Sequence, residues 1–129
     1  MRTLLCAVVA ALTLLLASQG SGRAGLAGGP ARAPALEVLV FEHPDCVYCR
    51  VFRRDVLPQY RQAVRGDAAP LRFVDIAAID TVGLGLNARI DTLPTAVVMR
   101  DGQEVDRIVG YWGPANFFKL LSRILARME

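Results

Sequence analysis

The chain has 129 residues, which is enough for one domain of ordinary size and too few for two domains with a linker. Hydrophobic residues make up 53% and charged residues 21%, a composition that excludes an intrinsically disordered chain. The sequence has 15 Lys and Arg residues and 12 Asp and Glu residues. Because Arg2, Arg23 and Arg32 precede the first predicted strand, the rest of the chain has 12 basic and 12 acidic residues, which provide no basic surface for nucleic acid.

The N-terminal residues have the order of a secretory signal peptide. A positive start at Arg2 is followed by an uncharged apolar run over Leu4–Ala17 and by small residues up to Ala24. We therefore expect residues 1–24 to be a signal peptide, cleaved between positions 24 and 33, and residues 25–35 to form a disordered tether. An uncleaved membrane anchor is the alternative, although as a helix the apolar run would span only about two-thirds of a bilayer core.

A strand, a helix and a second strand are expected next. Leu36–Phe41 is a short apolar and β-branched run, typical of a buried central strand. The helix is expected from Cys46 onward, with Pro58 kinking or dividing it. Its apolar face contains Phe52, Val56, Tyr60 and Val64. After a turn rich in Gly and Pro, Leu71–Asp75 alternates as a second strand.

Residues 76–92 have the least regular pattern. Gly83 and Gly85 oppose a long helix, and we expect a short helix over Leu84–Ile90.

The C-terminal part predicts a hairpin and a helix. Pro94–Met99 has the composition of a third strand, and Asp101-Gly102 is a hairpin signal leading into a fourth strand over Glu104–Val109, so the two should pair antiparallel. A breaker series over Gly110–Pro114 precedes the last helix. Its apolar residues are Phe117, Leu120, Leu121, Ile124, Leu125 and Met128. The element order predicts an α/β fold over residues 36–129, with a mixed four-stranded sheet flanked by helices.

Cys46-Val47-Tyr48-Cys49 stands where the first strand turns into the first helix. The helix dipole and the free backbone N–H groups there stabilise a thiolate on the first sulfur, which lowers the pKa of a thiol from about 8.5 to roughly 3.5–7.5. We therefore expect Cys46 to be a nucleophile and Cys49 to resolve the mixed disulfide that it forms. Because Cys6 lies in the predicted leader, any intramolecular disulfide of the exported chain would join Cys46 and Cys49.

Two alternatives apply to the cysteine pair. A structural disulfide would close so small a loop that it would stabilise the fold little. A metal-binding module could use His43, Cys46 and Cys49, but a closed zinc site takes four ligands and the sequence has no second cysteine pair. We expect neither a metal nor a cofactor.

The order strand, C-x-x-C helix, strand, Pro-Thr strand, hairpin and helix resembles the thioredoxin fold over about residues 36–128. The resemblance implies a cis peptide bond before Pro94 and a position for Leu93 beside the sulfur of Cys46. It also implies that Leu93, Pro94, Val47 and Tyr48 bind the substrate. Three further segments resemble the periplasmic thioredoxins of the bacterial sulfur-oxidation (Sox) system. These are Phe41–Cys49, the Pro94-Thr95 strand start, and Gly110-Tyr111-Trp112-Gly113 with Phe117-Phe118.

This resemblance implies a periplasmic, monomeric thiol-disulfide reductase. Its partner would be a periplasmic protein with a reactive cysteine, such as the sulfur-carrier protein of the Sox system, and a membrane thiol transporter would supply electrons. Tyr48 before the second cysteine is similar to glutaredoxins and disulfide isomerases, so a general disulfide oxidase or isomerase is the alternative.

The sequence departs from ordinary thioredoxins, which have Trp-Cys-Gly-Pro-Cys and a buried acid in the preceding strand. Here Asp45 precedes the first cysteine, and the strand ahead of it reads Val38-Leu39-Val40-Phe41. Glu42, His43 or Asp45 could replace the missing proton acceptor, or could be solvated and turn-forming residues. Tyr111 and Trp112 either line a partner groove or pack against the core.

Overall fold

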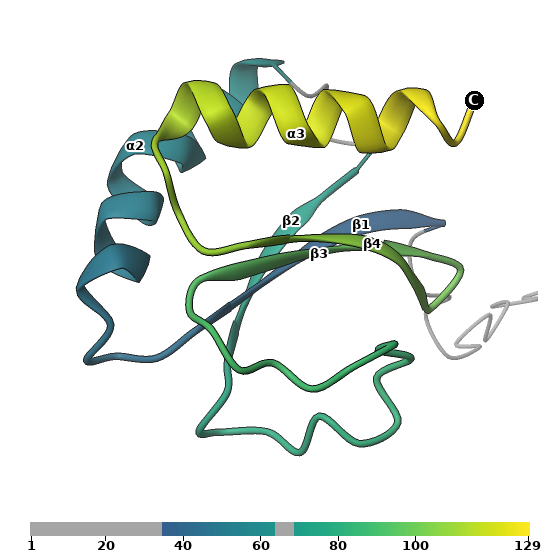
Figure 1. The fold of residues 1–129 in the computed structure, drawn as a ribbon. Helices are drawn as coiled ribbons and strands as arrows, with labels where there is room; N and C mark the ends of the chain where they lie inside the picture. Colours follow the sequence, from purple (N-terminus) through teal and green to yellow (C-terminus); the bar gives the residue numbers. More distant parts are fainter. Residues whose placement is uncertain (1–34, 64–68) are drawn as a thin grey trace, which may run out of the picture. The chain divides into compact units, whose positions relative to one another are not determined.

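A computed structural model describes residues 35–63 and 69–129 (Figure 1). The predicted signal peptide, its cleavage site and almost all of the predicted tether fall on residues 1–34, outside the described residues. No helix in the described part of the chain is both long and apolar enough to span a membrane.

One four-stranded mixed sheet, in the order β2-β1-β3-β4, forms the centre of the described residues. Its strands are β1 (Leu36–Glu42), β2 (Leu71–Asp75), β3 (Thr95–Arg100) and β4 (Gln103–Val109). β1 pairs parallel with β2 and antiparallel with β3, and β3 pairs antiparallel with β4. The predicted strands and the predicted hairpin are thus confirmed, with ends that differ by one residue.

The helices α2 (Val47–Ala63) and α3 (Pro114–Ala126) cover the same face of the sheet (Figure 1). Alternate residues of β1 point to that face because successive side chains of a strand point to opposite sides. The core there contains Val38, Val40, Phe52, Val56, Tyr60, Ala96, Val98, Ile108, Phe117, Leu121 and Ile124. Burial of each large apolar side chain contributes about 1.5–3 kcal/mol, which explains why both helices lie on this face.

The segment between β2 and β3 covers the opposite face of the sheet with turns and bends (Figure 1). The short helix predicted over Leu84–Ile90 is therefore wrong. Gly83 and Gly85 have φ values of 86° and 71°, a left-handed conformation that a helix does not contain. The apolar side chains of this segment instead pack on the sheet one by one. They are Leu84, Leu86, Ile90 and Leu93, in contact with Leu39, Phe41, Val97 and Met99.

Pro58 lies inside α2, which is continuous from Val47 to Ala63. The proline does not divide the helix. It is exposed, so water can bond to the carbonyl of Arg54, which has lost its amide partner in the helix.

Candidate redox site

The turn between β1 and α2 places Cys46 at the start of the helix. The backbone N–H of Cys46 donates to the carbonyl of His43 at 3.0 Å, which closes the turn, and its carbonyl accepts from the N–H of Arg50 at 3.3 Å. The first N–H groups of a helix have no partner within the helix and carry a partial positive charge. Cys46 is therefore at the end of α2 that favours a negatively charged sulfur.

Cys46 and Cys49 are joined by a disulfide, with their Cα atoms 5.2 Å apart. The backbone N–H of Cys49 donates a hydrogen bond of 3.1 Å to the sulfur of Cys46. The two residues differ in exposure: Cys49 is 2% exposed, whereas Cys46 is half-buried. A group that arrives from solvent thus has better access to Cys46, and the buried Cys49 is placed to act after it.

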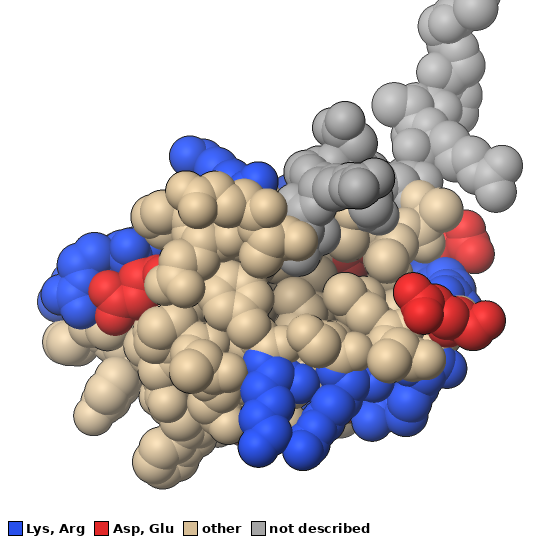
Figure 2. Space-filling model, turned by 90° about the horizontal axis from the view of Figure 1, so that it is seen from above, with Lys and Arg blue, Asp and Glu red and all other residues tan. Residues whose placement is uncertain are grey.

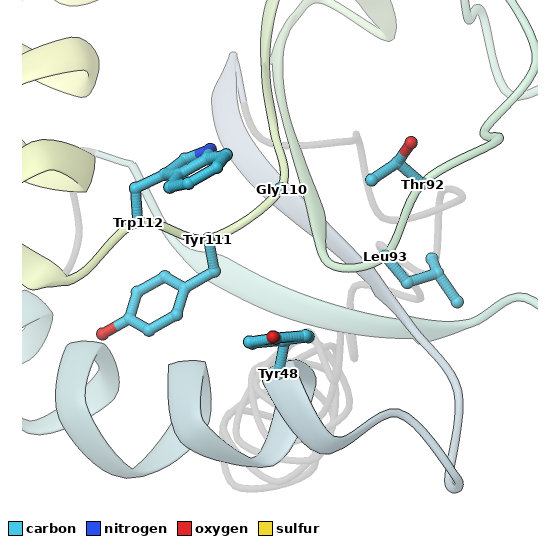
Figure 3. A pocket seen from close by; sticks show the side chains of 6 residues that line it. All are labelled: Tyr48, Thr92, Leu93, Gly110, Tyr111 and Trp112. Atoms are coloured by element: carbon cyan, nitrogen blue, oxygen red, sulfur yellow. The ribbon is translucent and has the colours of Figure 1, made fainter.

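A pocket of about 380 Å³ is lined in part by Tyr48, which lies between the two cysteines in the sequence (Figure 3). Three separate parts of the chain line it: the first turn of α2, the residues before β3, and the loop between β4 and α3. The lining residues are Tyr48, Thr92, Leu93, Gly110, Tyr111 and Trp112. In Figure 3 the rings of Tyr48, Tyr111 and Trp112 lie on one side, and Thr92 and Leu93 lie on the other. None of the lining side chains is charged, so the pocket suits an uncharged segment of a partner.

The residues that the resemblance implies for substrate binding occupy different positions. Tyr48 and Leu93 line the pocket, and Tyr48 is 65% exposed. The Leu93–Pro94 peptide bond is cis, and Pro94 is fully buried at the start of β3. Val47 is 58% exposed and is not among the residues that line the pocket.

Hydrogen bonds hold the backbone around Pro94 in place. Its carbonyl accepts from the N–H of Gly110 at 2.9 Å, which ties this segment to the end of β4. The hydroxyl of Thr95 donates to the carbonyl of Thr92 at 2.8 Å. Leu93 therefore sits between two anchored carbonyls, with its side chain against the apolar core on the far side of the sheet.

Tyr111 and Trp112 have separate roles, although they are adjacent in sequence. The ring of Tyr111 packs edge-on against Phe52, with ring centroids 5.4 Å apart, and also lines the pocket. Trp112 lines the pocket but is 81% exposed. Tyr111 therefore packs against the core and also lines the pocket, and its contact with a partner stays a prediction. For Trp112, the groove interpretation is the one that its exposure fits.

Sequence reasoning missed Thr92 and Gly110 as lining residues. Gly110 has a φ of 75°, which only glycine adopts at little cost, and the sequence marks it as part of a breaker series and of the segment that resembles the Sox thioredoxins, not as a lining residue. No local signal marks Thr92.

The three candidate proton acceptors have other roles in this structure. Glu42 forms an ion pair with Arg53, whose guanidinium lies 3.5 Å from the centroid of the Phe73 ring. His43 accepts a hydrogen bond of 3.2 Å at Nδ1 from the backbone N–H of Asp45. The side chain of Asp45 is 94% exposed. Proton transfer from Cys49 to one of these groups stays a prediction.

Basic side chains on the side of α2 and α3 lie in separate groups near the rim, with acidic side chains beside some of them (Figure 2). On α2, Arg54 pairs with Asp55 at 2.6 Å. The hydrogen bond from Arg54 lowers the pKa of Asp55 below its ordinary value, which keeps this carboxylate charged. Asp55 also lies 3.4 Å from the hydroxyl of Tyr111. The basic face of α2 is thus a solvated surface that Asp55 partly neutralises.

The metal-binding alternative gains no support from the geometry. Within residues 35–63 and 69–129, no three His, Cys, Asp or Glu side chains lie close enough together to hold a metal ion. Cys46 and Cys49 are joined in the disulfide, so their sulfurs are not thiolate ligands in this state.

Comparisons with known proteins match the same part of the chain. A family model described as a thioredoxin-like domain matches residues 33–125. The crystal structure of the periplasmic thioredoxin SoxS from Paracoccus pantotrophus, in its reduced form, is 33% identical with a TM-score of 0.66, and the match covers 73% of this chain and 99% of that chain.

More distant structures share the fold alone. Mitochondrial thioredoxin 3 from Saccharomyces cerevisiae is 20% identical with a TM-score of 0.57, over 71% of this chain and 81% of that chain. Thioredoxin from Fasciola hepatica is 22% identical with a TM-score of 0.53, over 71% of this chain and 83% of that chain. A search among curated proteins returned no match.

Proposed function

Because the chain belongs to the thioredoxin-like family and is a thiol-disulfide oxidoreductase, we propose that it acts in the periplasm as a reductase for a cysteine of a partner protein. The observation that carries the proposal is the placement of the Cys46 sulfur. It lies at the start of α2, accepts the N–H of Cys49, and is more exposed than the sulfur that resolves it.

The reaction begins with the reduced form of the protein. The Cys46 thiolate attacks one sulfur of the partner's disulfide, so that a mixed disulfide forms while the partner's own S–S bond breaks and its leaving thiolate takes a proton. Cys49 then loses its proton and attacks the sulfur of Cys46. The Cys46–Cys49 disulfide forms, and the partner's second sulfur leaves as a thiol. Two electrons and two protons pass to the partner.

The oxidised form described here is the product of that second attack. A further turnover requires two electrons from a dithiol donor, and a membrane thiol transporter is the donor that we propose. The N–H of Cys49 and the start of α2 stabilise the negative charge on the Cys46 sulfur, both when it attacks and when it leaves.

The uncharged pocket gives the partner a place to bind beside the reacting sulfurs. Tyr48 and Trp112 present exposed rings, and Leu93 forms the opposite wall. A partner segment that enters the pocket would bring its sulfur to Cys46. We propose that Cys46 and Cys49 are the catalytic residues and that Tyr48, Leu93 and the backbone at Pro94 bind the partner.

The N-terminal pattern and the similarity to a periplasmic thioredoxin support the proposed compartment. We propose a signal peptide over residues 1–24, a tether over 25–35 and the catalytic domain over 36–129. In an oxidising compartment reactive cysteines become blocked, and a dedicated reductant restores them. The sulfur-carrier protein of the Sox system is the partner that the similarity favours.

A trapping experiment tests the proposal. In the Cys49→Ser variant a mixed disulfide on Cys46 cannot be resolved, so the partner should remain attached. The variant is expressed in the periplasm of a bacterium that contains a Sox system, and adducts are identified on non-reducing gels and by mass spectrometry. The Cys46→Ser variant is the matched control, because it removes the attacking sulfur.

One dominant adduct with a sulfur-carrier protein, absent from the control, is the expected result. Many adducts with unrelated secreted proteins would favour a general oxidase or isomerase. The reduction potential separates these alternatives further, because thioredoxin-like reductants lie near about −270 mV and strong oxidants near about −120 mV. No adduct at all would contradict the proposed reaction.

A further inference from the structure

The segment between β2 and β3 contains no helix or strand, although it covers a whole face of the sheet (Figure 1). Long connections of this kind in a compact domain are usually functional. The end of this segment carries Thr92 and Leu93, which form one wall of the pocket. What holds the segment in one conformation therefore bears on how a partner binds.

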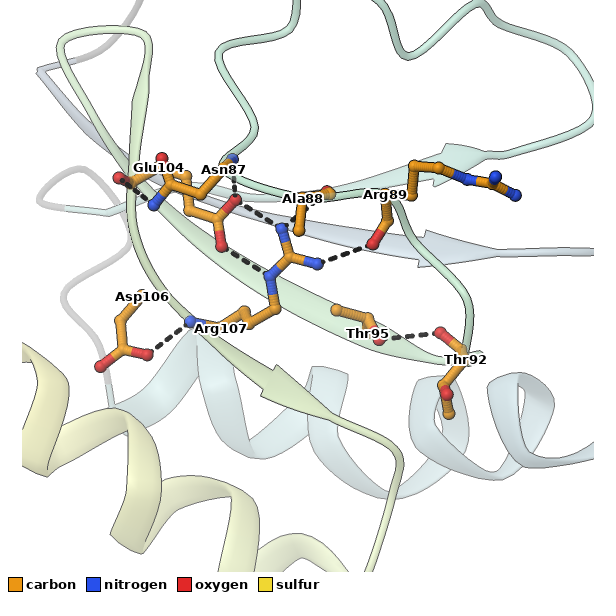
Figure 4. Close-up of polar contacts among 8 residues, drawn as sticks. All are labelled: Asn87, Ala88, Arg89, Thr92, Thr95, Glu104, Asp106 and Arg107. Carbon is orange, nitrogen blue, oxygen red and sulfur yellow. Dashed lines mark hydrogen bonds and ion pairs between the residues drawn. The ribbon is translucent and has the colours of Figure 1, made fainter.

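One arginine of β4 anchors the segment (Figure 4). The guanidinium of Arg107 donates to the carbonyl of Arg89 at 3.0 Å and to the carbonyl of Ala88 at 2.9 Å. Its Nε and Nη2 atoms also donate to the two carboxylate oxygens of Glu104, each at 2.6 Å. The planar, forked guanidinium makes all of these contacts at once, which a point charge cannot do.

Glu104 also holds the segment, both through Arg107 and directly. Its side chain is 3% exposed, and it accepts the backbone N–H of Asn87 at 2.7 Å. The backbone N–H of Glu104 donates to the carbonyl of Gly85 at 2.9 Å. The hydrogen bonds from Arg107 lower the pKa of Glu104, so that the buried carboxylate stays charged and oriented.

A buried ion pair of this kind adds little net stability, because removing both charges from water costs about as much as their attraction returns. Its contribution is geometric, since it is satisfied in one arrangement of the segment. Ala88 and Arg89 are held at one end, and the carbonyls of Thr92 and Pro94 are held at the other.

We propose that Arg107, oriented by Glu104, is a positioning residue for partner binding. Together with Glu104, which holds Asn87, it fixes the segment at Ala88 and Arg89 on β4 and thereby sets the place of the pocket wall that Thr92 and Leu93 form. The proposal rests on the proposed function, because it concerns how a protein substrate reaches Cys46. A small disulfide does not fill the pocket and depends on the cysteines alone.

Two variants test this role. Arg107→Lys keeps a positive charge beside Glu104 but cannot bond both carbonyls and both carboxylate oxygens. The double variant Glu104→Gln, Arg107→Met removes both charges, so that no buried charge is left unpaired if Arg107→Lys folds poorly. The matched control is Asp106→Asn, Arg127→Met, which removes an ion pair that β4 makes with the end of the chain. The side-chain oxygen of the asparagine can still accept the backbone N–H of Arg107, as Asp106 does at 2.8 Å.

Each protein is reduced, freed of reductant and mixed with either insulin or bis(2-hydroxyethyl) disulfide, and its single-turnover oxidation is followed over a range of concentrations. For both Arg107 variants we expect the half-saturating insulin concentration to rise by roughly tenfold, because a displacement of about 1 Å at a binding site costs up to about a hundredfold. The rate with the small disulfide should change far less, and the control should match the unaltered protein. Hydrogen exchange at the N–H of Gly110, which bonds to Pro94, should become faster in the Arg107 variants.

The positioning role would be overturned if the Arg107 variants reacted more slowly with both disulfides to the same extent, or if their reaction with insulin were unchanged. It would also be overturned if the unaltered protein showed no preference for insulin over the small disulfide. An unaltered protein that oxidises with neither disulfide would instead contradict the proposed function itself. Melting curves measured beside the assays show whether each variant is folded at the assay temperature.

Discussion

The backbone N–H of Cys49 points at the sulfur of Cys46, 3.1 Å away, within the first turn of α2. The two cysteines are therefore linked by this hydrogen bond as well as by their disulfide. When the disulfide is reduced, the same N–H and the helix terminus would favour the thiolate of Cys46 over its thiol.

We therefore expect the pKa of the Cys46 thiol to lie below the ordinary value of about 8.5. The test is the rate of alkylation of Cys46 against pH in the Cys49→Ser variant, where no second thiol of the cysteine pair reacts. The midpoint should fall well below that of a free cysteine in a short peptide measured alongside. A midpoint that coincides with the peptide's would show that the helix terminus does not activate this sulfur.

Tyr60 provides a test of stability and its pH dependence. Its buried hydroxyl donates to the carbonyl of Ala69 at 2.7 Å, and burial raises its pKa to about 12. Tyr60→Phe leaves that buried carbonyl without its donor, so the free energy of unfolding should fall by about 1–3 kcal/mol at neutral pH.

The pH dependence of Tyr60 has a definite sign. Above about pH 10 the unfolded chain releases the phenolic proton, whereas the folded chain keeps it until about pH 12. The contribution of Tyr60 to stability is therefore complete below pH 10 and is lost as the pH rises toward 12. Denaturant titrations between these values should show a steeper decline for the unaltered protein than for Tyr60→Phe. An equal decline of stability with pH in the two proteins would contradict the raised pKa of Tyr60.

Alanine variants of Trp112 and Tyr111 should distinguish an effect on partner binding from an effect on the free energy of unfolding. Trp112 is 81% exposed, so Trp112→Ala should change the free energy of unfolding by less than about 0.5 kcal/mol. Its loss should nevertheless weaken insulin reduction, because Trp112 lines the pocket. Tyr111→Ala removes the contact with Phe52 and should cost about 2 kcal/mol or more. An unchanged insulin reaction in Trp112→Ala would show that its ring does not contact the partner.

Gly85 and Gly83 form a matched pair for the segment between β2 and β3. A Cβ on Gly85 would lie 2.1 Å from the carbonyl oxygen of Gly102, whereas a Cβ on Gly83 would meet nothing within 4 Å. Both residues have a positive φ, so both alanine variants carry a backbone cost of roughly 1–2 kcal/mol. Thermal unfolding should show a clearly larger loss for Gly85→Ala. Equal losses of thermal stability in the two variants would mean that the backbone at Gly85 shifts to make room for the added Cβ.

The strands, the apolar faces of both helices and the cysteine pair could all be predicted from the sequence because each depends on local periodicity. Val38–Phe41 is apolar in consecutive positions, and Phe52, Val56 and Tyr60 repeat at helical spacing. The motif Cys46-Val47-Tyr48-Cys49 indicates redox chemistry because a helix start lowers the pKa of a thiol, and a helix start can be recognised from the local sequence. The cis bond before Pro94 was implied by the family resemblance, since an X-Pro bond by itself is expected to be trans.

The covering of the second sheet face and the walls of the pocket were decided by tertiary structure. Leu84–Ile90 contains enough apolar residues for a helix, but its leucines contact the sheet singly and Gly85 fits closely against the hairpin turn. Arg107 lies in β4, and no pattern within that strand shows that its guanidinium meets carbonyls of residues 88 and 89. Local periodicity determines which residues face a core. Side chains that satisfy the backbone of a distant segment are determined only when the chain is folded, because their partners are set by the topology.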